Sequence, residues 1–514
     1  MSSPTTPAHD NLTGKRSRWL DAVERIGNAL PDAMTIFILL AVGVALCSWL
    51  AERMGFSATH PVTGQPVTAV NLLTADNLRR LLTEAVKNFI EFKPLGVVLA
   101  AMIGIGVAER SGLIETALRA LVESVSARWV TPAIILAGML SHSAADAGFV
   151  ILPPIAAAIY ARLGRNPIAG VAAAFAGVGG GFSANLLLSP LDPMLAALTE
   201  KAAQLLDPRY AVRATANYFF LATSVLLLTG VATWVSNRFV EPRLGATKDG
   251  ANAGTTEPIT RHQKRGLIAA GVAVAIMALV VVLMTVPKGG LLRDASGGLK
   301  PFFDSLIVLV MLAFMLAGIA YGMTTKSVRS DRDVARMMSE TMATMGNYIV
   351  LAFFAAQALA LFEWSRLAPI LAVEGANLLK KAHLHDGPLF IGVILITATI
   401  NLLMSSASAK WTMMAPVFVP MMMVLGYAPE TTQALYRVGD SVTNIITPLN
   451  YYLPSIIVPL CRRYDSKAGL GTVIAMMLPY SIAFGLTWSA MLIVWIYMGW
   501  PVGPGAPLHY AISP

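Results

Sequence analysis

Residues 135–164 read ILAGMLSHSAADAGFVILPPIAAAIYARLG, and residues 393–426 read VILITATINLLMSSASAKWTMMAPVFVPMMMVLG. Each stretch has apolar arms on either side of a short segment rich in Ser and Ala. A helix needs about 20 apolar residues to cross the ~30 Å hydrocarbon layer of a membrane, and these arms are shorter. The pattern predicts two re-entrant hairpins, at 129–163 and 388–426, each entering the membrane and leaving it on the same side.

A second long apolar tract follows each hairpin, and polar and helix-breaking residues interrupt both tracts. The first covers 167–200 and contains NLLLSPLD from Asn185, and the second covers 430–461 and contains NIITPLN from Asn444. Ordinary membrane helices avoid such interruptions because they leave backbone groups without hydrogen bonds in lipid. We therefore expect two broken helices, whose unwound segments lie near the membrane midplane.

The two halves of the chain share this design, which indicates an internal duplication. Shared prolines, and an Asn followed by Ser/Thr-Pro-Leu in both halves, are hard to obtain from a biased composition alone. At one constant offset, five residues of the first hairpin region fall on identical residues of the second: Ser143, Ala145, Pro154, Gly164 and Pro167 on Ser405, Ala407, Pro416, Gly426 and Pro429.

The composition is that of a membrane protein. Of the 514 residues, 56% are hydrophobic and 13% are charged, about half the charged fraction of a soluble domain. The fold class we expect is an all-α polytopic membrane protein. Seven continuous spans are predicted at 32–52, 95–109, 215–238, 265–286, 304–324, 340–362 and 470–498.

The formal net charge is +9, but Lys and Arg gather in short loops, which indicates membrane orientation and no nucleic-acid partner. One arrangement places every basic loop in the cytoplasm: nine spans, made of the seven continuous spans and the two broken helices. The N-terminus is then cytoplasmic and the C-terminus periplasmic in a bacterial inner membrane. The two hairpins enter from opposite sides, as expected of an inverted-topology repeat.

This arrangement divides the chain into five parts. They are a cytoplasmic segment (1–30), a first half (31–240), a flexible cytoplasmic linker (241–264), a second half (265–500) and a periplasmic tail (501–514). Residues 112–126 and 366–382 mix charge with apolar positions at helical spacing, so we expect helices at the membrane surface there.

Charged residues inside the membrane point to a functional site. Each costs about 2.5–3.5 kcal/mol even on a lenient insertion scale, so Asp192, Arg437 and Asp440 need an explanation. Arg437 and Asp440 lie three apart on a helix, and one interpretation is a structural ion pair between them. In the other, Arg437 binds a substrate carboxylate while Asp440 or Asp192 binds the coupling cation.

Further residues near the breaks have two interpretations each. Trp411 could stack on an aromatic ligand or serve packing alone. Lys410 is expected to extend to the outer membrane interface. The coupling ion is a proton or sodium, and no other cofactor or metal is expected. A sodium site could use oxygen atoms from Asp146, Asn185 and Asn444.

Four motifs, SHSAADAGFVILPP, GGFSANLLLSPLDP, SSASAKWTMMAPVFVPM and YRVGDSVTNIITPLNYY, resemble the AbgT family of p-aminobenzoyl-glutamate transporters, from about residue 20 to 500. The resemblance implies a homodimer with nine spans and two hairpins per subunit. It implies transport of p-aminobenzoyl-glutamate, an aromatic amide and glutamate conjugate, or of related folate breakdown products, and some members are described as sulfonamide exporters. It places functional positions at Asp192, Asn401, Ser408, Trp411, Pro429, Arg437, Asp440 and Pro448.

Two other functional classes stay open at this point. A passive channel for small organic anions would show a continuous polar stripe along several helices, whereas the polar residues here cluster at two breaks. A membrane-bound amidase would need a nucleophile or a metal site, and the sequence contains no recognisable motif for either. A cation-coupled secondary transporter is therefore the function that we predict, and not an enzyme.

Overall fold

A computed structural model describes residues 33–59, 64–144, 147–245, 259–382, 386–448 and 450–511. The segment 1–30, which we expect to be cytoplasmic, and most of the predicted linker 241–264 lie outside these residues. The described chain is mainly helical, and its strands β1 (Ser57–Thr59) and β2 (Pro66–Thr68) form one antiparallel pair. The first-half helices are α2 (Ala33–Arg53), α3 (Ala75–Ile90), α4 (Lys93–Arg110), α5 (Leu113–Glu123), α6 (Val130–Leu140), α7 (Ala147–Arg162), α8 (Pro167–Phe175), α9 (Leu191–Gln204), α10 (Tyr218–Val235) and α11 (Glu241–Leu244).

The second half begins with α12. Its helices are α12 (Arg261–Thr285), α13 (Lys300–Thr325), α14 (Asp331–Thr344), α15 (Gly346–Trp364), α16 (Leu367–Lys381), α17 (Asp386–Leu403), α18 (Ala407–Val424), α19 (Pro429–Val442), α20 (Val458–Arg462) and α21 (Leu470–Tyr497). Short helical turns join some of these: η1 (Ala127–Trp129), η2 (Ser141–Ala144), η3 (Ala176–Gly180), η4 (Ser236–Val240) and η5 (Leu453–Ile457).

Among the described residues, eight helices are long and apolar enough to cross a membrane. Seven of them overlap the seven predicted continuous spans, so the all-α polytopic fold class is confirmed. The eighth is α17, which the sequence interpretation treats as one short arm of the second hairpin. Its 18 residues are apolar from Leu389 almost to its end, whereas its counterpart α6 has only 11 residues. The two hairpin regions are therefore unequal.

One predicted span begins too early. Residues 340–344 belong to α14, a helix with charged residues in its first turn, and α15 begins only at Gly346. The reason is the charged sequence of α14, DRDVARMMSETMAT, which gives a mean hydropathy too low for a span. The helices expected at 112–126 and 366–382 are present as α5 and α16.

Both broken helices are interrupted where the sequence predicts. The first winds through α8 and η3, is not helical from Gly181 to Pro190, and resumes as α9. The second ends as α19 at Val442 and resumes as η5. A Cβ atom on Gly180 would lie 2.6 Å from a ring carbon of Phe484, and one on Gly179 would lie 2.7 Å from Ile445. The glycines of η3 thus let the start of the first break pack closely on the second break and on α21.

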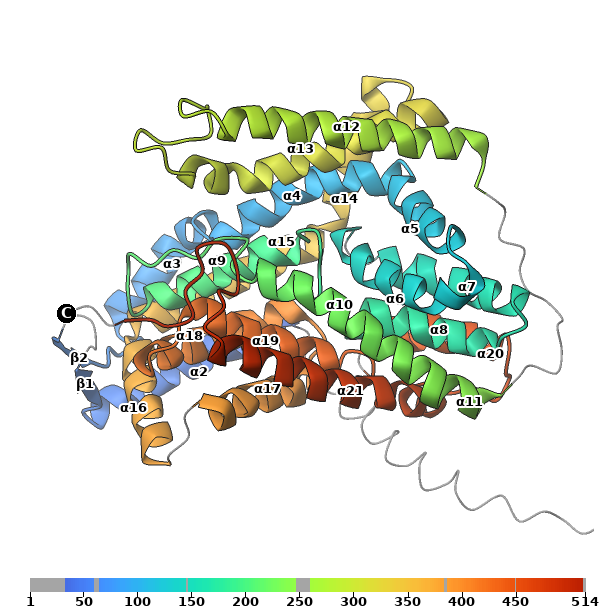
Figure 1. Cartoon of the computed structure of the whole chain (residues 1–514). Coiled ribbons are helices and arrows are strands. Elements are labelled where there is room, and N and C mark those ends of the chain that lie inside the picture. Colours follow the sequence, from blue (N-terminus) through green and yellow to red (C-terminus); the bar gives the residue numbers. More distant parts are fainter. Residues whose placement is uncertain are drawn as a thin grey trace, which may run out of the picture.

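Helices from the two halves interlock. In Figure 1, α12, α13 and α4 run side by side across the top of the view, and the other spans lie beneath them. Helix α9 packs on α18 and α19, and α10 packs on α21. The core therefore joins segments that are more than 200 residues apart in sequence.

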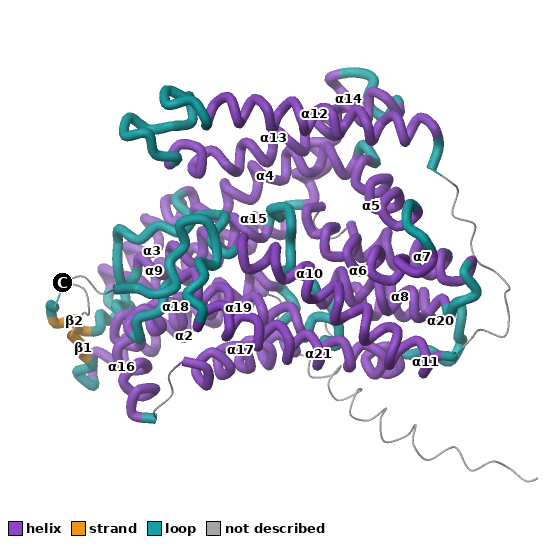
Figure 2. Tube along the Cα trace, in the orientation of Figure 1, coloured by secondary structure: helices purple, strands orange, loops and turns teal. Residues whose placement is uncertain are grey.

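The C-terminal tail folds back over the same end of the molecule as the loop that follows α9. Figure 2 shows both as loop segments on the side of the view where the C-terminus lies. The backbone carbonyl of Val502 accepts a hydrogen bond from Phe220 N (3.1 Å), and that of Leu508 accepts one from Ala428 N (3.0 Å). The tail thus ties the start of α10 to the start of α19.

Close packing of α4 against α13 gives a first prediction. A Cβ atom on Gly104 would lie 1.9 Å from the backbone oxygen of Met311, and backbone cannot yield as a side chain can. Gly104→Ala should lower the free energy of unfolding by about 1–3 kcal/mol because the helices must separate. The measurement is denaturant titration in mixed micelles. Gly230→Ala on α10 is the matched control, since nothing lies within 4 Å of its new Cβ; equal losses in both variants would contradict the prediction.

Candidate functional site

Helix α19 is the centre of the site. All 14 of its residues are buried, although its sequence PETTQALYRVGDSV is largely polar. Pro429 begins it, where the missing N–H of proline costs nothing. A buried charge is stable only next to an opposite charge or a hydrogen-bonding group. The groups that pair with the charged residues of α19 therefore define the site.

Arg437 pairs with Asp192 of α9. Its Nη2 lies 2.5 Å from Asp192 Oδ1, and the two side chains are 2% and 3% exposed. The other carboxylate oxygen accepts hydrogen bonds from Ser189 N (2.6 Å) and Ser189 Oγ (2.9 Å). Asp192 also lies in the first turn of α9, where the helix dipole favours a negative charge. This ion pair joins the two broken helices.

The ion pair with Asp192 leaves one hydrogen-bond donor of the Arg437 guanidinium without an acceptor. Its Nε is buried and has no hydrogen-bond partner among the described residues. A buried N–H without an acceptor costs about 1–3 kcal/mol. The Nε–H group of Arg437 can therefore donate to one further acceptor oxygen.

The interpretation of Arg437 and Asp440 as a pair is wrong. Asp440 is paired with Lys410 of α18 instead, with 2.6 Å between Nζ and Oδ1. Arg437 and Asp440 therefore have partners on two different helices, α9 and α18, because their side chains leave α19 in different directions. The expectation that Lys410 extends to the membrane interface is also wrong: its side chain is 0% exposed. The carboxylate of Asp440 compensates for its burial.

Asn401 completes a second polar cluster. Its Nδ2 lies 2.6 Å from the backbone oxygen of Asp440 and 2.9 Å from Asn444 Oδ1. Its Oδ1 accepts a hydrogen bond from Lys410. The end of α17 is thereby held to the end of α19 and to the break that follows it.

Trp411 is packed within the protein. It is 0% exposed, its ring stacks on Tyr436 with centroids 4.3 Å apart, and its Nε1 donates to Thr199 Oγ1 at 2.8 Å. Tyr436 also donates to the backbone oxygen of Ala407 (2.5 Å). In this conformation the indole therefore supports α18 against α9 and α19, and it is closed to ligands because its side chain is fully buried.

The remaining predicted residues are spread around this centre. Ser408 is partly exposed at the start of α18, beside Ser406 (Oγ–Oγ 3.4 Å). Pro429 is buried two turns of α19 before Arg437, about 12 Å along the helix. Pro448 is buried in the second break. Asp146 lies outside the described residues.

The two asparagines proposed as sodium ligands lie in different clusters. Asn185 donates to Ser189 Oγ (3.4 Å), beside Asp192, whereas Asn444 contacts Asn401. A hydrogen bond from Ser183 N to Ser441 Oγ (3.2 Å) joins the first break to the last turn of α19.

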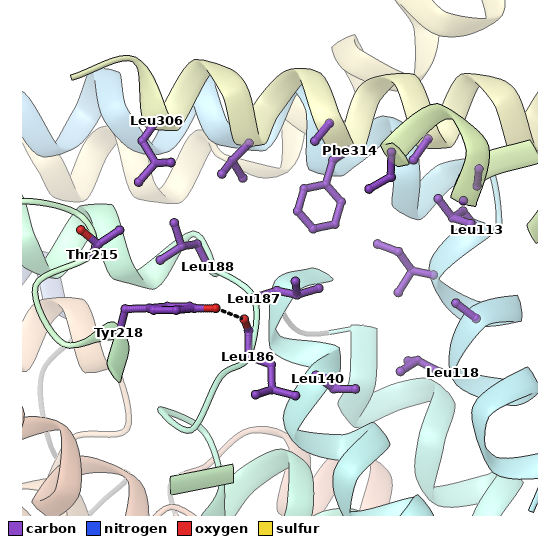
Figure 3. A pocket seen from close by; sticks show the side chains of 18 of the residues that line it. Leu113, Leu118, Leu140, Leu186, Leu187, Leu188, Thr215, Tyr218, Leu306 and Phe314 are labelled. Atoms are coloured by element: carbon purple, nitrogen blue, oxygen red, sulfur yellow. Dashed lines mark hydrogen bonds between the residues drawn. The ribbon is translucent and has the colours of Figure 1, made fainter. Parts of the chain in front are cut away.

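A large apolar cavity lies beside the first break. It has a volume of about 790 Å³, and Figure 3 shows α5, α13 and the loop 186–188 around it. Tyr218 points across its edge and donates to the backbone oxygen of Leu186 at 3.1 Å. A smaller pocket shares Leu188 and Leu306 with it and reaches Ser189, a partner of Asp192. The apolar cavity thus lies next to the polar site, which itself is closed.

Residues 18–510 match the AbgT putative transporter family. The chain belongs to the AbgT family. It is similar to the p-aminobenzoyl-glutamate transport protein of Escherichia coli K12, with 35% identity over 98% of this chain and 99% of that protein.

Two solved structures have the same fold as this AbgT chain. The YdaH transporter of Alcanivorax borkumensis, described as having an unusual topology, is 43% identical and superposes with a TM-score of 0.87 over 92% of this chain and all of that one. MtrF of Neisseria gonorrhoeae, described in connection with a class of antimetabolite efflux pumps, is 42% identical, with a TM-score of 0.88 over 95% of this chain and all of that one.

The sequence interpretation misses three residues of this AbgT site, Thr199, Glu430 and Tyr436, and misplaces a fourth, Lys410. Thr199 and Tyr436 lie in helical sequence without any unusual feature. Glu430, buried at the start of α19, accepts a hydrogen bond from Tyr210 (2.8 Å). Lys410 does carry a signal, since it is a lone charge in an apolar tract, but only the direction of its side chain tells a buried ammonium from one at the interface.

Proposed function

We propose that this AbgT chain is a secondary transporter of the bacterial inner membrane that moves p-aminobenzoyl-glutamate or related folate catabolites and aromatic antimetabolites, sulfonamides among them. Transport is coupled to a cation, proton or sodium, and works by alternating access. The observation that carries this proposal is the buried ion pair between Arg437 and Asp192. It joins two interrupted helices, and the guanidinium keeps one donor free.

Substrate recognition follows from these groups. A substrate carboxylate would engage Arg437 through two N–H groups, using the free Nε, and would compete with Asp192. Asp192 released from Arg437 would then be a buried carboxylate without a counter-charge, which favours uptake of a cation. Opening of the Trp411 and Tyr436 stack would offer aromatic faces to the substrate ring. Substrate binding and cation binding would thereby be linked through one residue.

The proposed architecture contains nine spans and two re-entrant hairpins in two inverted repeats. The two observed breaks support it, because interrupted helices that meet inside a membrane protein are typical of secondary transporters. The N-terminus is then cytoplasmic and the tail periplasmic. We also propose a homodimer, as the family resemblance implies.

The closed state of the site favours a carrier over a channel. Arg437, Asp192 and Asp440 are at most 3% exposed, so no open polar path includes them in this conformation. A channel would pass anions by diffusion, whereas a carrier must rearrange this ion pair in each cycle. The amidase alternative has no support from the arrangement, in which the polar side chains pair with one another.

Flux in proteoliposomes tests the proposal. Labelled p-aminobenzoyl-glutamate should accumulate above equilibrium under an imposed proton or sodium gradient, and Arg437→Met should lower the initial rate by at least about 100-fold, as expected when a charge-assisted contact of about 3 kcal/mol is lost. Equilibration without accumulation would indicate a channel, and release of free p-aminobenzoate would indicate an amidase. Arg79→Met is the control variant, since it makes the same substitution at an arginine of α3 whose side chain is 70% exposed and that the proposal does not use.

A further inference from the structure

The apolar cavity beside the first break follows α13 over much of its length. On this helix its lining begins at Phe302 and ends at Ala317. The two residues are 15 positions apart (317 minus 302), which is about 22 Å along a helix. Aliphatic side chains of α5 and α12 line it as well. A cavity of this length suits an extended chain better than a single aromatic ring.

Side chains of the protein do not cover the walls of this cavity. Leu187 of the first break and Val274 of α12 both line it, and they are 55% and 44% exposed. Water has few partners there, because only Thr215 and Tyr218 among its described lining residues have polar side chains. Tyr218 already donates to the backbone oxygen of Leu186. The cavity therefore favours an apolar occupant.

The polar groups of the lining lie at one end of the cavity. Figure 3 shows Thr215 and Tyr218 at the end where Leu306 lies, whereas Leu113 and Leu118 lie at the other end. All the lining residues that α5 contributes are Leu, Ile or Ala. A ligand that matches this cavity therefore has a polar end and a long apolar part.

Arg213 adds a positive charge at the polar end. Its Cζ lies 4.4 Å from the ring centroid of Phe303, which lines the cavity. A Cβ atom on Gly505 would lie 2.7 Å from Arg213 Nη1, and the neighbouring Pro504 lines the cavity too. Arg213 is exposed, and the ion pairs of the described chain do not include it. A free guanidinium of this kind binds a phosphate group through two N–H donors.

We infer that the cavity binds one acyl chain of a membrane phospholipid whose phosphate pairs with Arg213. Bilayer lipid borders the cavity, because only 11% of the most apolar window of α12 and 22% of that of α13 are buried. The acyl chain lies between α13 and the loop 186–188, and it fills the space between the outer helices and the first broken helix. The inference goes beyond the proposed function and does not depend on the transported substrate.

A substitution that fills the cavity tests the position of the acyl chain. Gly271 of α12 lines the cavity, and a Cβ atom there would meet nothing within 4 Å. Gly271→Phe places a ring in the space, and each methylene that it displaces costs about fourfold in affinity. We expect its Kd for palmitoyl-oleoyl phosphatidylglycerol to rise at least about tenfold. The measurement is native mass spectrometry of the delipidated full chain in detergent, and wild type should bind one lipid per chain at saturation.

Two controls make the cavity and the phosphate separately testable. Gly230→Phe introduces the same ring on α10, also with nothing within 4 Å of its Cβ atom, and should bind the lipid like wild type. Arg213→Met should raise the Kd for phosphatidylglycerol at least about tenfold, whereas Arg209→Met, in the same loop, should not change it. Diacylglycerol with the same chains lacks the phosphate, so wild type and Arg213→Met should bind it alike.

The inference fails if Gly271→Phe and Gly230→Phe bind phosphatidylglycerol equally well, because the lipid then lies on the outer surface. Tighter binding of oleate than of phosphatidylglycerol would make the ligand a free fatty acid. Displacement of the lipid by p-aminobenzoyl-glutamate would make the cavity part of the substrate path. If Gly271→Phe does not fold, wild type still decides: dioctanoyl phosphatidylglycerol should bind at least about tenfold more weakly than the longer lipid, and equal affinity would contradict an acyl-chain site.

Discussion

Arg437→Met should lower the free energy of unfolding by about 3–5 kcal/mol. The substitution leaves Asp192 buried with hydrogen bonds from Ser189 but without its counter-charge. Asp192→Leu should cost a similar amount, because the guanidinium is then left unpaired at 2% exposure. Denaturant titration of the purified variants in mixed micelles measures both losses.

The double variant separates the structural from the functional role of this ion pair. Arg437→Met combined with Asp192→Leu replaces two charges by apolar groups of similar volume, and such replacements of buried pairs are often neutral or stabilising. We expect stability within about 1 kcal/mol of wild type and no transport of p-aminobenzoyl-glutamate. A double variant that is stable and still transports would show that the pair only holds α9 to α19.

Trp411→Ala should be the second large loss, again about 3–5 kcal/mol. The indole is fully buried, stacks on Tyr436 and bonds to Thr199, so its removal leaves a cavity between α18, α9 and α19. The same titration measures the loss.

Trp411→Phe is the matched control. It keeps a ring against Tyr436 and removes the hydrogen bond to Thr199, so we expect a loss of about 1–3 kcal/mol, smaller than that of the alanine variant. Equal losses in the two variants would mean that the hydrogen bond, and not the stacking, accounts for the effect.

The length of apolar stretches was sufficient to predict seven of the eight span-length helices among the described residues, and both breaks, but α17 was taken for a short hairpin arm. An apolar stretch of about 20 residues indicates a membrane helix whatever its neighbours are. Lipid requires every span to be long enough to cross it and to satisfy its own backbone hydrogen bonds. The error at 340–345 arose where an amphipathic helix, α14, runs into a span with a single-residue interruption at Met345. Hydropathy changes gradually there, although the helix does not continue.

Partners within the site could not be predicted in the same way. Spacing along α19 makes Arg437 and Asp440 neighbours, yet each pairs with a residue of another helix, Asp192 or Lys410. Such choices depend on which helices flank α19, and this is set by contacts between distant parts of the chain. The sequence therefore predicted which residues are unusual but not which of them meet.

The folded-back tail has a consequence for the order in which the protein assembles during synthesis. Residues 502 and 508 follow α21 and are synthesised after it, yet their carbonyls accept hydrogen bonds from Phe220 and Ala428. The first half can insert and form its helices earlier, but the hydrogen bond at the start of α10 can form only after α21 and the residues behind it have been synthesised. Emergence of the segment after α21, and not insertion of α21 itself, is thus the step that closes this end of the molecule.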